Sequence, residues 1–279
     1  MLSGAMQRAV LIMFIAMSCI PAGDSAGKVL SSQLGVSPPF IAWSRFALGA
    51  LMILPFMKPG HFAILRNPWI WFRGGLLAAG ISSIQMALQT APLANVFAAF
   101  FIGPLFSYLL AVIFLREPIT PLRTVLILLG FAGVLTVIRP GAEMEIGLLW
   151  ATAAGLCYGS FLTMSRWLSG VGTPLALSFS QLFIATVLIL PFGVTDVPEF
   201  TPAIVGLTVV SAFFSMAGNL LLLFAYRTAN ATVLAPLVYF QLIAAVALGW
   251  VIFGDLPDAW TWAGLAIIIG AGLTSARLR

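Results

Sequence analysis

Ten apolar runs, each long enough to cross a lipid bilayer, dominate this sequence of 279 residues. A transmembrane helix needs about 20 mostly apolar residues, and Pro, Gly and charged residues divide the chain into runs of that length. Only 8% of the residues are charged, against about 25% in a typical soluble domain. Lipid must therefore be the solvent for most of the apolar surface. We expect an all-α polytopic membrane protein with helices near residues 7–28, 39–57, 69–89, 92–115, 121–138, 146–168, 174–192, 201–226, 231–253 and 259–277.

The charged residues are distributed unevenly between the two sides of the expected membrane. With the N-terminus inside, ten of the thirteen basic residues fall on the inner side: Arg8, Lys58, Arg66, Arg73, Arg116, Arg123, Arg166, Arg227, Arg277 and Arg279. The acids fall mostly on the outer side: Glu143, Glu145, Asp196, Glu199, Asp255 and Asp258. Because cytoplasmic connections are enriched in Lys and Arg, we expect both termini to be cytoplasmic. The basic residues are scattered, so the net charge of +5 does not indicate a nucleic-acid partner.

The two halves of the chain resemble each other. Ordered matches occur at a nearly constant offset of 136 to 139 residues, among them LMILPF (51–56) with VLILPF (187–192), ALQTAPLANV (87–96) with AYRTANATVL (225–234), and LLGFAGVL (128–135) with IIIGAGLT (267–274). Each half holds five spans, and an odd number turns the second copy upside down. We therefore expect two inverted five-helix repeats, 1–140 and 141–279, that form one transmembrane domain around a solvated vestibule.

Inverted repeats are typical of secondary transporters, which bind their substrate near the membrane midplane between the repeats. The alternative is an old duplication that is kept only for packing.

Several segments resemble the EamA-type, ten-helix branch of the drug/metabolite transporter superfamily: WSRFALGALMILP (43–55), GPLFSYLLAVIFLREPIT (103–120) with LLGFAGVLTV (128–137), and ATVLAPLVYFQLIAAVALGWVIFGDLP (231–257) followed by IIIGAG (267–272). The resemblance covers nearly the whole chain. It implies a transporter of a bacterial inner membrane that exports aromatic or other neutral amino acids, as YddG-type exporters do. Export of another metabolite or drug class is the alternative. The chain departs from the family at Asp255, where the family has Glu.

Polar residues recur at helical spacing in two expected spans. Ser82 and Gln85 share one face of the third span, and Asn219 follows Ser211 and Ser215 on one face of the eighth. Polar groups within a membrane face protein or water, so Ser82, Gln85 and Asn219 are candidate substrate-binding residues. Hydrogen bonding between helices is the alternative role.

Aromatic residues near the centres of the expected spans are the second group of candidates. They are Phe101, Tyr158, Phe161 and Tyr239. Aromatic faces with a few polar groups suit an amphipathic solute. Packing, or contact with lipid, is the alternative role.

Three charged residues lie near the outer mouth. Asp24 precedes Lys28 by four residues, the favourable order for a helical ion pair, and Arg45 lies about two turns into the next span. One reading is an outer gate or a contact for the charged groups of a substrate. The other is a neutralised group in which Lys28 extends to the interface.

Several classes of function lack the residues that they need. The chain has one His and two Cys, and no Cys/His set, so we expect no metal site and no catalytic residues. It also lacks a GxxxxGK[ST] loop, so ATP is not expected to drive transport. We expect no cofactor, a small-molecule substrate and lipid as partners, and a monomer as a plausible state. A membrane enzyme and a non-transporting assembly protein are the less favoured classes.

Overall fold

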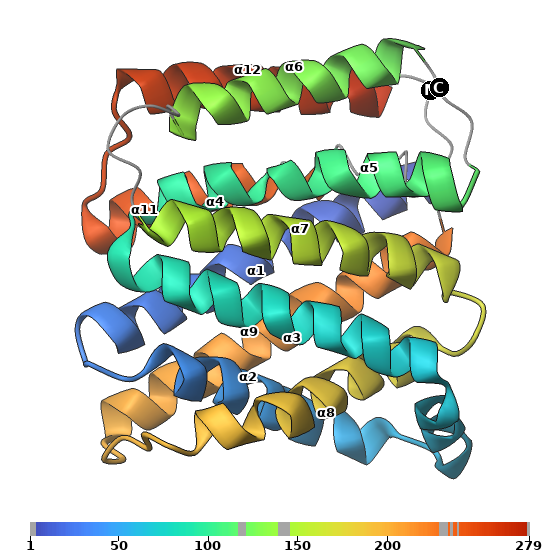
Figure 1. Cartoon of the computed structure of the whole chain (residues 1–279), viewed down its shortest axis with the longest axis vertical. Helices are drawn as coiled ribbons and strands as arrows, with labels where there is room; N and C mark the ends of the chain where they lie inside the picture. The colour runs from blue at the N-terminus through green and yellow to red at the C-terminus, as the bar shows by residue number, and fades with distance from the viewer. Residues whose placement is uncertain are drawn as a thin grey trace.

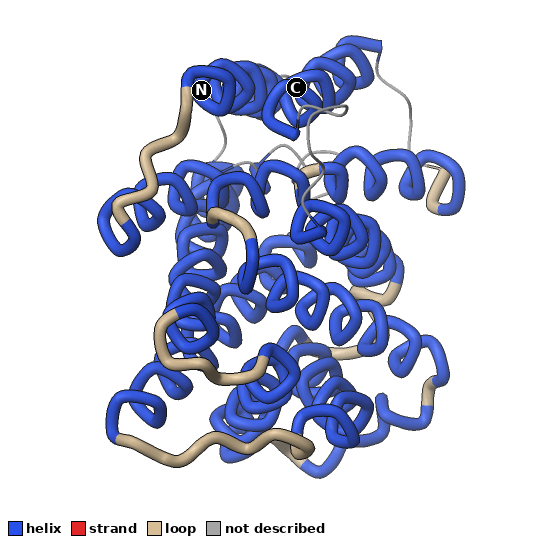
Figure 2. The backbone as a smooth tube through the Cα atoms, turned by 60° about the vertical axis from the view of Figure 1, so that its left-hand side comes forward, coloured by secondary structure: helices blue, strands red, loops and turns tan. Residues whose placement is uncertain are grey.

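A computed structural model describes residues 4–116, 121–138, 146–228, 234, 237–238 and 240–277. All secondary structure in this part of the chain is helical, and short connections join the helices (Figure 2). The first half contains α1 (Gly4–Ser32), α2 (Pro38–Ile53), η1 (Leu54–Phe56), η2 (Pro59–Arg66), α3 (Pro68–Thr90), α4 (Leu93–Phe100), α5 (Ile102–Phe114) and α6 (Pro121–Ile138). The second half contains α7 (Ile146–Trp167), α8 (Pro174–Gly193), α9 (Pro202–Thr228), α11 (Phe240–Phe253) and α12 (Ala259–Arg277).

The expected spans agree closely with these helices, and prolines mark several of the boundaries. Pro121 and Pro174 are the first residues of α6 and α8, where a missing N–H group is harmless. The fourth expected span differs, because it is two helices, α4 and α5, that meet at Phe101. Pro104 has no N–H to donate to the carbonyl of Phe100, which favours a break there. Part of the ninth expected span, 231–253, lies outside the described residues.

The apolar surface agrees with a membrane environment. Within the described residues, five helical segments meet the length and hydropathy of a membrane span: Pro38–Phe56, Asn95–Phe114, Ile146–Trp167, Pro174–Gly193 and Pro202–Arg227. Large apolar side chains are exposed on the flanks of the bundle, among them Phe114 (73%) and Val251 (77%). These side chains would be costly in water and are stable against lipid.

The helix packing has the approximate two-fold symmetry of an inverted repeat. By the sequence offset, α1, α2, α3, α5 and α6 correspond to α7, α8, α9, α11 and α12. The pair α1–α9 has its counterpart in α3–α7, and α1–α11 has its counterpart in α5–α7. The pairs α2–α8 and α6–α12 join corresponding helices directly, and α6 and α12 lie together at one edge (Figure 1). The halves therefore meet along α1, α3, α7 and α9, and also through the pairs α2–α8 and α6–α12.

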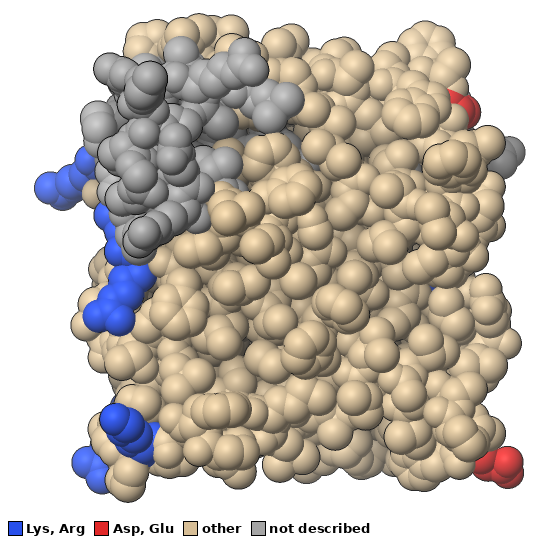
Figure 3. All heavy atoms as spheres, turned by 180° about the vertical axis from the view of Figure 1, so that it is seen from behind, with Lys and Arg blue, Asp and Glu red and all other residues tan. Residues whose placement is uncertain are grey.

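The two ends of the helical bundle differ in charge. Helix α1 begins and α12 ends at the same end (Figure 1). Exposed Lys and Arg gather along one edge of the molecule, and Asp and Glu lie at the opposite edge (Figure 3). We call these the basic end, which holds the α2–α3 and α7–α8 connections, and the acidic end, which holds the α1–α2, α8–α9 and α11–α12 connections. That the basic end faces the cytoplasm remains a prediction.

Candidate functional site

A buried ion pair joins α1 to α2 in the half of the bundle toward the acidic end. Arg45 Nη1 donates to Asp24 Oδ1 at 2.5 Å, and their side chains are only 1% and 5% exposed. Gln85 Nε2 of α3 lies 3.4 Å from the same carboxylate oxygen. Asp24 therefore links three helices of the first half.

Two glycines of α1 allow this arrangement. A Cβ at Gly27 would lie 2.7 Å from Gln85 Oε1, and a Cβ at Gly23 would lie 3.0 Å from the carbonyl oxygen of Ser211. Ser211 Oγ on α9 donates to the carbonyl of Gly23 at 2.8 Å. The close contact of α1 with both α3 and α9 places the ion pair where the halves meet.

A small cavity adjoins the pair. Its lining comes from both halves: Ile20, Asp24, Arg45, Gly80, Ile81, Ile84, Phe97, Phe100, Tyr158, Ser215, Asn219 and Gln241. About 20 Å³ is open to the centre of a water molecule, which is room for about one water. This cavity is therefore too small for a metabolite in this conformation, and the solvated vestibule between the halves stays a prediction.

The cavity presents polar atoms without hydrogen-bond partners in the described part of the chain. They are Arg45 Nε, the Tyr158 hydroxyl, Asn219 Oδ1 and Gln241 Oε1. Asn219 donates its Nδ2 to the carbonyl of Ser215 at 2.9 Å, which fixes Oδ1 as the unpaired end. Buried polar groups are nearly always paired, so these atoms make the cavity a candidate binding site.

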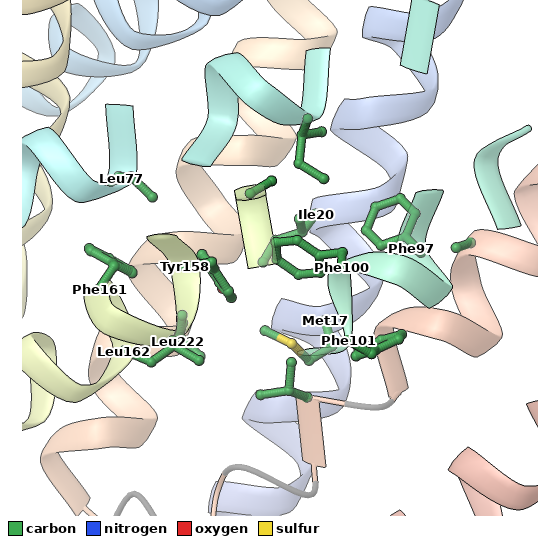
Figure 4. Close-up of a cluster of buried hydrophobic side chains, with 14 of the residues drawn as sticks. Met17, Ile20, Leu77, Phe97, Phe100, Phe101, Tyr158, Phe161, Leu162 and Leu222 are labelled. Carbon is green, nitrogen blue, oxygen red and sulfur yellow. The ribbon is translucent and has the colours of Figure 1, made fainter. Parts of the chain in front are cut away.

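Aromatic rings form the apolar wall of the cavity. Phe100 and Tyr158 lie with ring centroids 5.0 Å apart, and Tyr158 stacks on Phe161 at 5.7 Å. Figure 4 shows Phe97 and Phe100 close to Ile20, with Tyr158 and Phe161 following on α7. Such a wall suits a ring or another flat apolar group.

The expected binding residues occupy different places around this cavity. Tyr158 and Asn219 line it. Gln85 instead contacts Asp24, and the ring of Phe161 stacks on that of Tyr158 outside the lining. Phe101 is 1% exposed, at the α4–α5 junction, and is not part of the lining. The remaining two are Ser82, whose buried hydroxyl has no partner within the described ranges, and Tyr239, which lies outside them.

The expected pairing of Asp24 with Lys28 is wrong. Lys28 Nζ lies 3.3 Å from Asp255 Oδ2 and 3.4 Å from the carbonyl of Ala91. It also lies 4.7 Å from the ring centroid of Phe253. Asp24 pairs instead with Arg45, which lies at the same depth on α2. Lys28 thus links α1 to the second half at the acidic end.

Arg73, which the sequence predicts to lie on the inner side, is buried within the bundle near the basic end. Arg73 is 0% exposed and donates to Ser165 Oγ (2.9 Å), the Leu177 carbonyl (3.2 Å) and Gln181 Oε1 (2.5 Å). Its guanidinium carbon lies 4.7 Å from the ring centroid of Phe161. The signal was in the sequence, because Arg73 falls four residues inside the expected span 69–89.

Among the described residues, no three His, Cys, Asp or Glu side chains come together as a metal site would need. The arrangement instead offers charge, hydrogen-bonding atoms and rings to a solute.

Comparison with known proteins gives a consistent set of relatives. A model of the EamA-like transporter family matches residues 7–139 and again residues 145–275. A riboflavin transporter of Brucella anthropi is 28% identical, over 94% of this chain and 95% of that protein. An S-adenosylmethionine uptake transporter of Rickettsia conorii is 29% identical, over 88% and 86%. A pseudopaline exporter of Pseudomonas aeruginosa is 27% identical, over 86% of each.

A solved crystal structure has the same fold. It matches with a TM-score of 0.70 and 20% identity, over 97% of this chain and 96% of that chain.

Proposed function

Because the chain belongs to the EamA-like transporter family, we propose that it moves a small amphipathic metabolite across the membrane at the Asp24–Arg45 cavity. The protein is a membrane transporter of small metabolites and not an enzyme. The proposal adds the site and the kind of solute.

One observation carries the choice of site. The cavity lies where the inverted halves meet, and it combines a buried ion pair with unpaired polar atoms and an aromatic wall. Ionisable groups within a membrane are expensive and mark transport pathways. A solute with a charged group and a ring would satisfy both the polar and the apolar side of this cavity.

The closed cavity favours alternating access. Inverted repeats allow two conformations in which the halves exchange roles, one open to each side. Substrate would enter when α1 and α9, or α3 and α7, move apart at one end. The buried pair and the rings would then lie at the bottom of an open vestibule.

The relatives favour a broader range of solutes than amino acids. Their names refer to riboflavin, S-adenosylmethionine and pseudopaline, so the alternative of another metabolite class has more support than export of aromatic amino acids. Both uptake and export occur among these names. Export remains our prediction for this chain.

Counterflow in proteoliposomes tests the proposal. Vesicles with purified protein are loaded with unlabelled riboflavin, S-adenosylmethionine or L-phenylalanine and then exposed to the same compound in radiolabelled form. We expect label to accumulate for at least one compound, and the Asn219→Ala variant to lose most of that accumulation. The exposed Gln33→Ala variant is the matched control. If vesicles with the protein take up no more label than empty vesicles for any of the three compounds, the proposed class of solutes is rejected.

Net efflux from vesicles of known protein orientation gives the direction. Faster movement from the basic toward the acidic end, under equal gradients, is the result expected of an exporter.

A further inference from the structure

Arg73 is a buried cation that has no carboxylate partner in the part of the chain that the structure describes. Asp255 pairs with Lys28 and Asp24 pairs with Arg45, and the three acceptors that the structure describes around Arg73 are all neutral. A buried charge is costly unless an opposite charge compensates it. Packing alone does not explain an uncompensated guanidinium at this position.

A second donor beside Arg73 also lacks a partner. Gln181 Oε1 accepts from Arg73, so the amide nitrogen Nε2 is the free end. That nitrogen is buried and has no hydrogen-bond acceptor among the residues that the structure describes. As far as the described residues extend, the cluster therefore has an uncompensated positive charge and an unpaired N–H donor, both of which would suit an anion.

The inverted repeat relates the Arg73 cluster to the Asp24–Arg45 cluster. Gln181 on α8 is the counterpart of Arg45 on α2, at an offset of 136 residues, and Arg73 on α3 is the counterpart of Ser211 on α9, at an offset of 138. Each cluster thus lies between corresponding helices and contains one arginine. The cluster toward the acidic end holds the carboxylate of Asp24, whereas the one toward the basic end holds no acid among the described residues.

The Arg73 cluster lies next to the cavity along α7. Tyr158 lines the cavity, and Phe161 stacks on Tyr158. The Arg73 guanidinium lies over the ring of Phe161. Arg73 is five residues after Pro68, so it is about 7–8 Å along α3 from the basic end. The two rings therefore separate the cavity from this arginine.

We propose that Arg73 and Gln181 form a second subsite, toward the basic end, that binds the anionic group of the transported metabolite. The inference rests on the proposed function and extends it, because it requires a substrate with a carboxylate or phosphate. When α3 moves from α7, Phe161 leaves the guanidinium and the anionic group of the substrate takes its place. The substrate then supplies the charge that Asp24 supplies in the other cluster.

Thermal unfolding of the purified protein tests this without any need for transport. The probes are benzoate and its uncharged analogue benzyl alcohol, at equal concentration and ionic strength. Wild type is expected to gain stability with benzoate over benzyl alcohol, because a ligand that binds the folded state raises the melting temperature. The Arg73→Gln variant is expected to lose this difference, with an affinity for benzoate weakened about 10-fold or more. The control is Arg66→Gln, at an exposed arginine of η2.

A second variant keeps the arginine, so the test survives if Arg73→Gln does not fold. Gln181→Glu places a carboxylate beside Arg73. It is expected to raise the melting temperature without benzoate and to abolish the benzoate effect, since its own carboxylate fills the subsite.

Three results would overturn the proposal. The first is no rise in the melting temperature of wild type with benzoate, and the second is an equally large rise in Gln181→Glu. The third is an Arg73-dependent rise with phosphatidylglycerol but not with benzoate, since it would assign the site to lipid. If wild type shows the Arg73-dependent benzoate effect but carries none of the three labelled compounds, only the proposed solutes fail.

Discussion

Lys28 binds Asp255, 227 residues away, and not Asp24 on its own helix. The pair joins α1 of the first half to the α11–α12 connection of the second half, at the acidic end. It is partly exposed, at 11% and 39% of the two side chains. It is therefore placed to hold the halves together at one mouth of the transporter.

Breaking this pair should loosen the acidic end. Lys28→Met is expected to change the overall stability little, because partly exposed pairs contribute about 0–1 kcal/mol. It should nevertheless increase hydrogen–deuterium exchange in the α11–α12 connection. The exchanged pair, Lys28→Asp with Asp255→Lys, should restore part of the protection. Unchanged exchange in Lys28→Met would show that the pair does not hold this mouth closed.

The Asp24–Arg45 pair should behave differently, because both side chains are buried. Asp24→Asn leaves the Arg45 guanidinium uncompensated, and removing one partner of a buried pair costs about 3–5 kcal/mol. The variant is therefore expected to melt well below wild type and to transport poorly. In the double variant Asp24→Asn with Arg45→Gln, the loss of stability should be smaller than in Asp24→Asn alone. A loss equal to the sum of the two single losses would contradict this view of the pair.

The fold was largely predictable from the sequence because lipid imposes a simple rule on helix length and composition. The predicted bounds 121–138 and 259–277 agree with α6 and α12. The break at Phe101 was missed, since the apolar run continues through it and hydropathy does not register a lost backbone hydrogen bond. The inverted arrangement followed from the repeat and the odd number of spans per half.

The candidate site was less predictable, because helical spacing gives the face of a residue and not its partner. The spacing placed Ser211, Ser215 and Asn219 on one buried face, which is correct. The partner of Lys28 depends on a contact between the halves, and local spacing suggested Asp24 instead. Arg73 was counted only as a charge on the inner side, because its position in the sequence does not show that it is fully buried.

Gln85 and Asn219 should matter for transport more than for insertion into the membrane. Gln85→Ala removes the amide that contacts Asp24, and Asn219→Ala removes the unpaired oxygen that faces the cavity. Each is expected to lower the counterflow rate about 10-fold, the value of one or two hydrogen bonds to a buried ligand. Protein levels in the membrane should stay near wild type. If both variants are fully active with normal affinity, neither residue belongs to the site.

The charge difference between the two ends predicts the orientation in the membrane. Because Lys and Arg are enriched on the cytoplasmic side, single cysteines at Arg66 and Lys58 should be protected from an impermeant maleimide in intact cells. Cysteines at Asp196 and Glu199 in the α8–α9 connection should react. The background variant lacks Cys19 and Cys157, which are both free thiols. The reverse pattern of labelling would invert the assignment of the basic end and the predicted direction of export.

A substitution at Gly27 tests whether the position of the Gln85 side chain matters, without removing that side chain. A Cβ at Gly27 would lie 2.7 Å from Gln85 Oε1, the far end of a flexible side chain. Gly27→Ala should therefore fold, displace the amide of Gln85 from Asp24, and lower transport about as much as Gln85→Ala. The double variant should be no worse than Gln85→Ala alone, because both changes remove the same contact. The control is Gly206→Ala on α9, where a Cβ meets open space. Counterflow rates and melting temperatures of the four variants decide the matter: additive losses of transport in the double variant would mean that Gly27 acts on something other than Gln85.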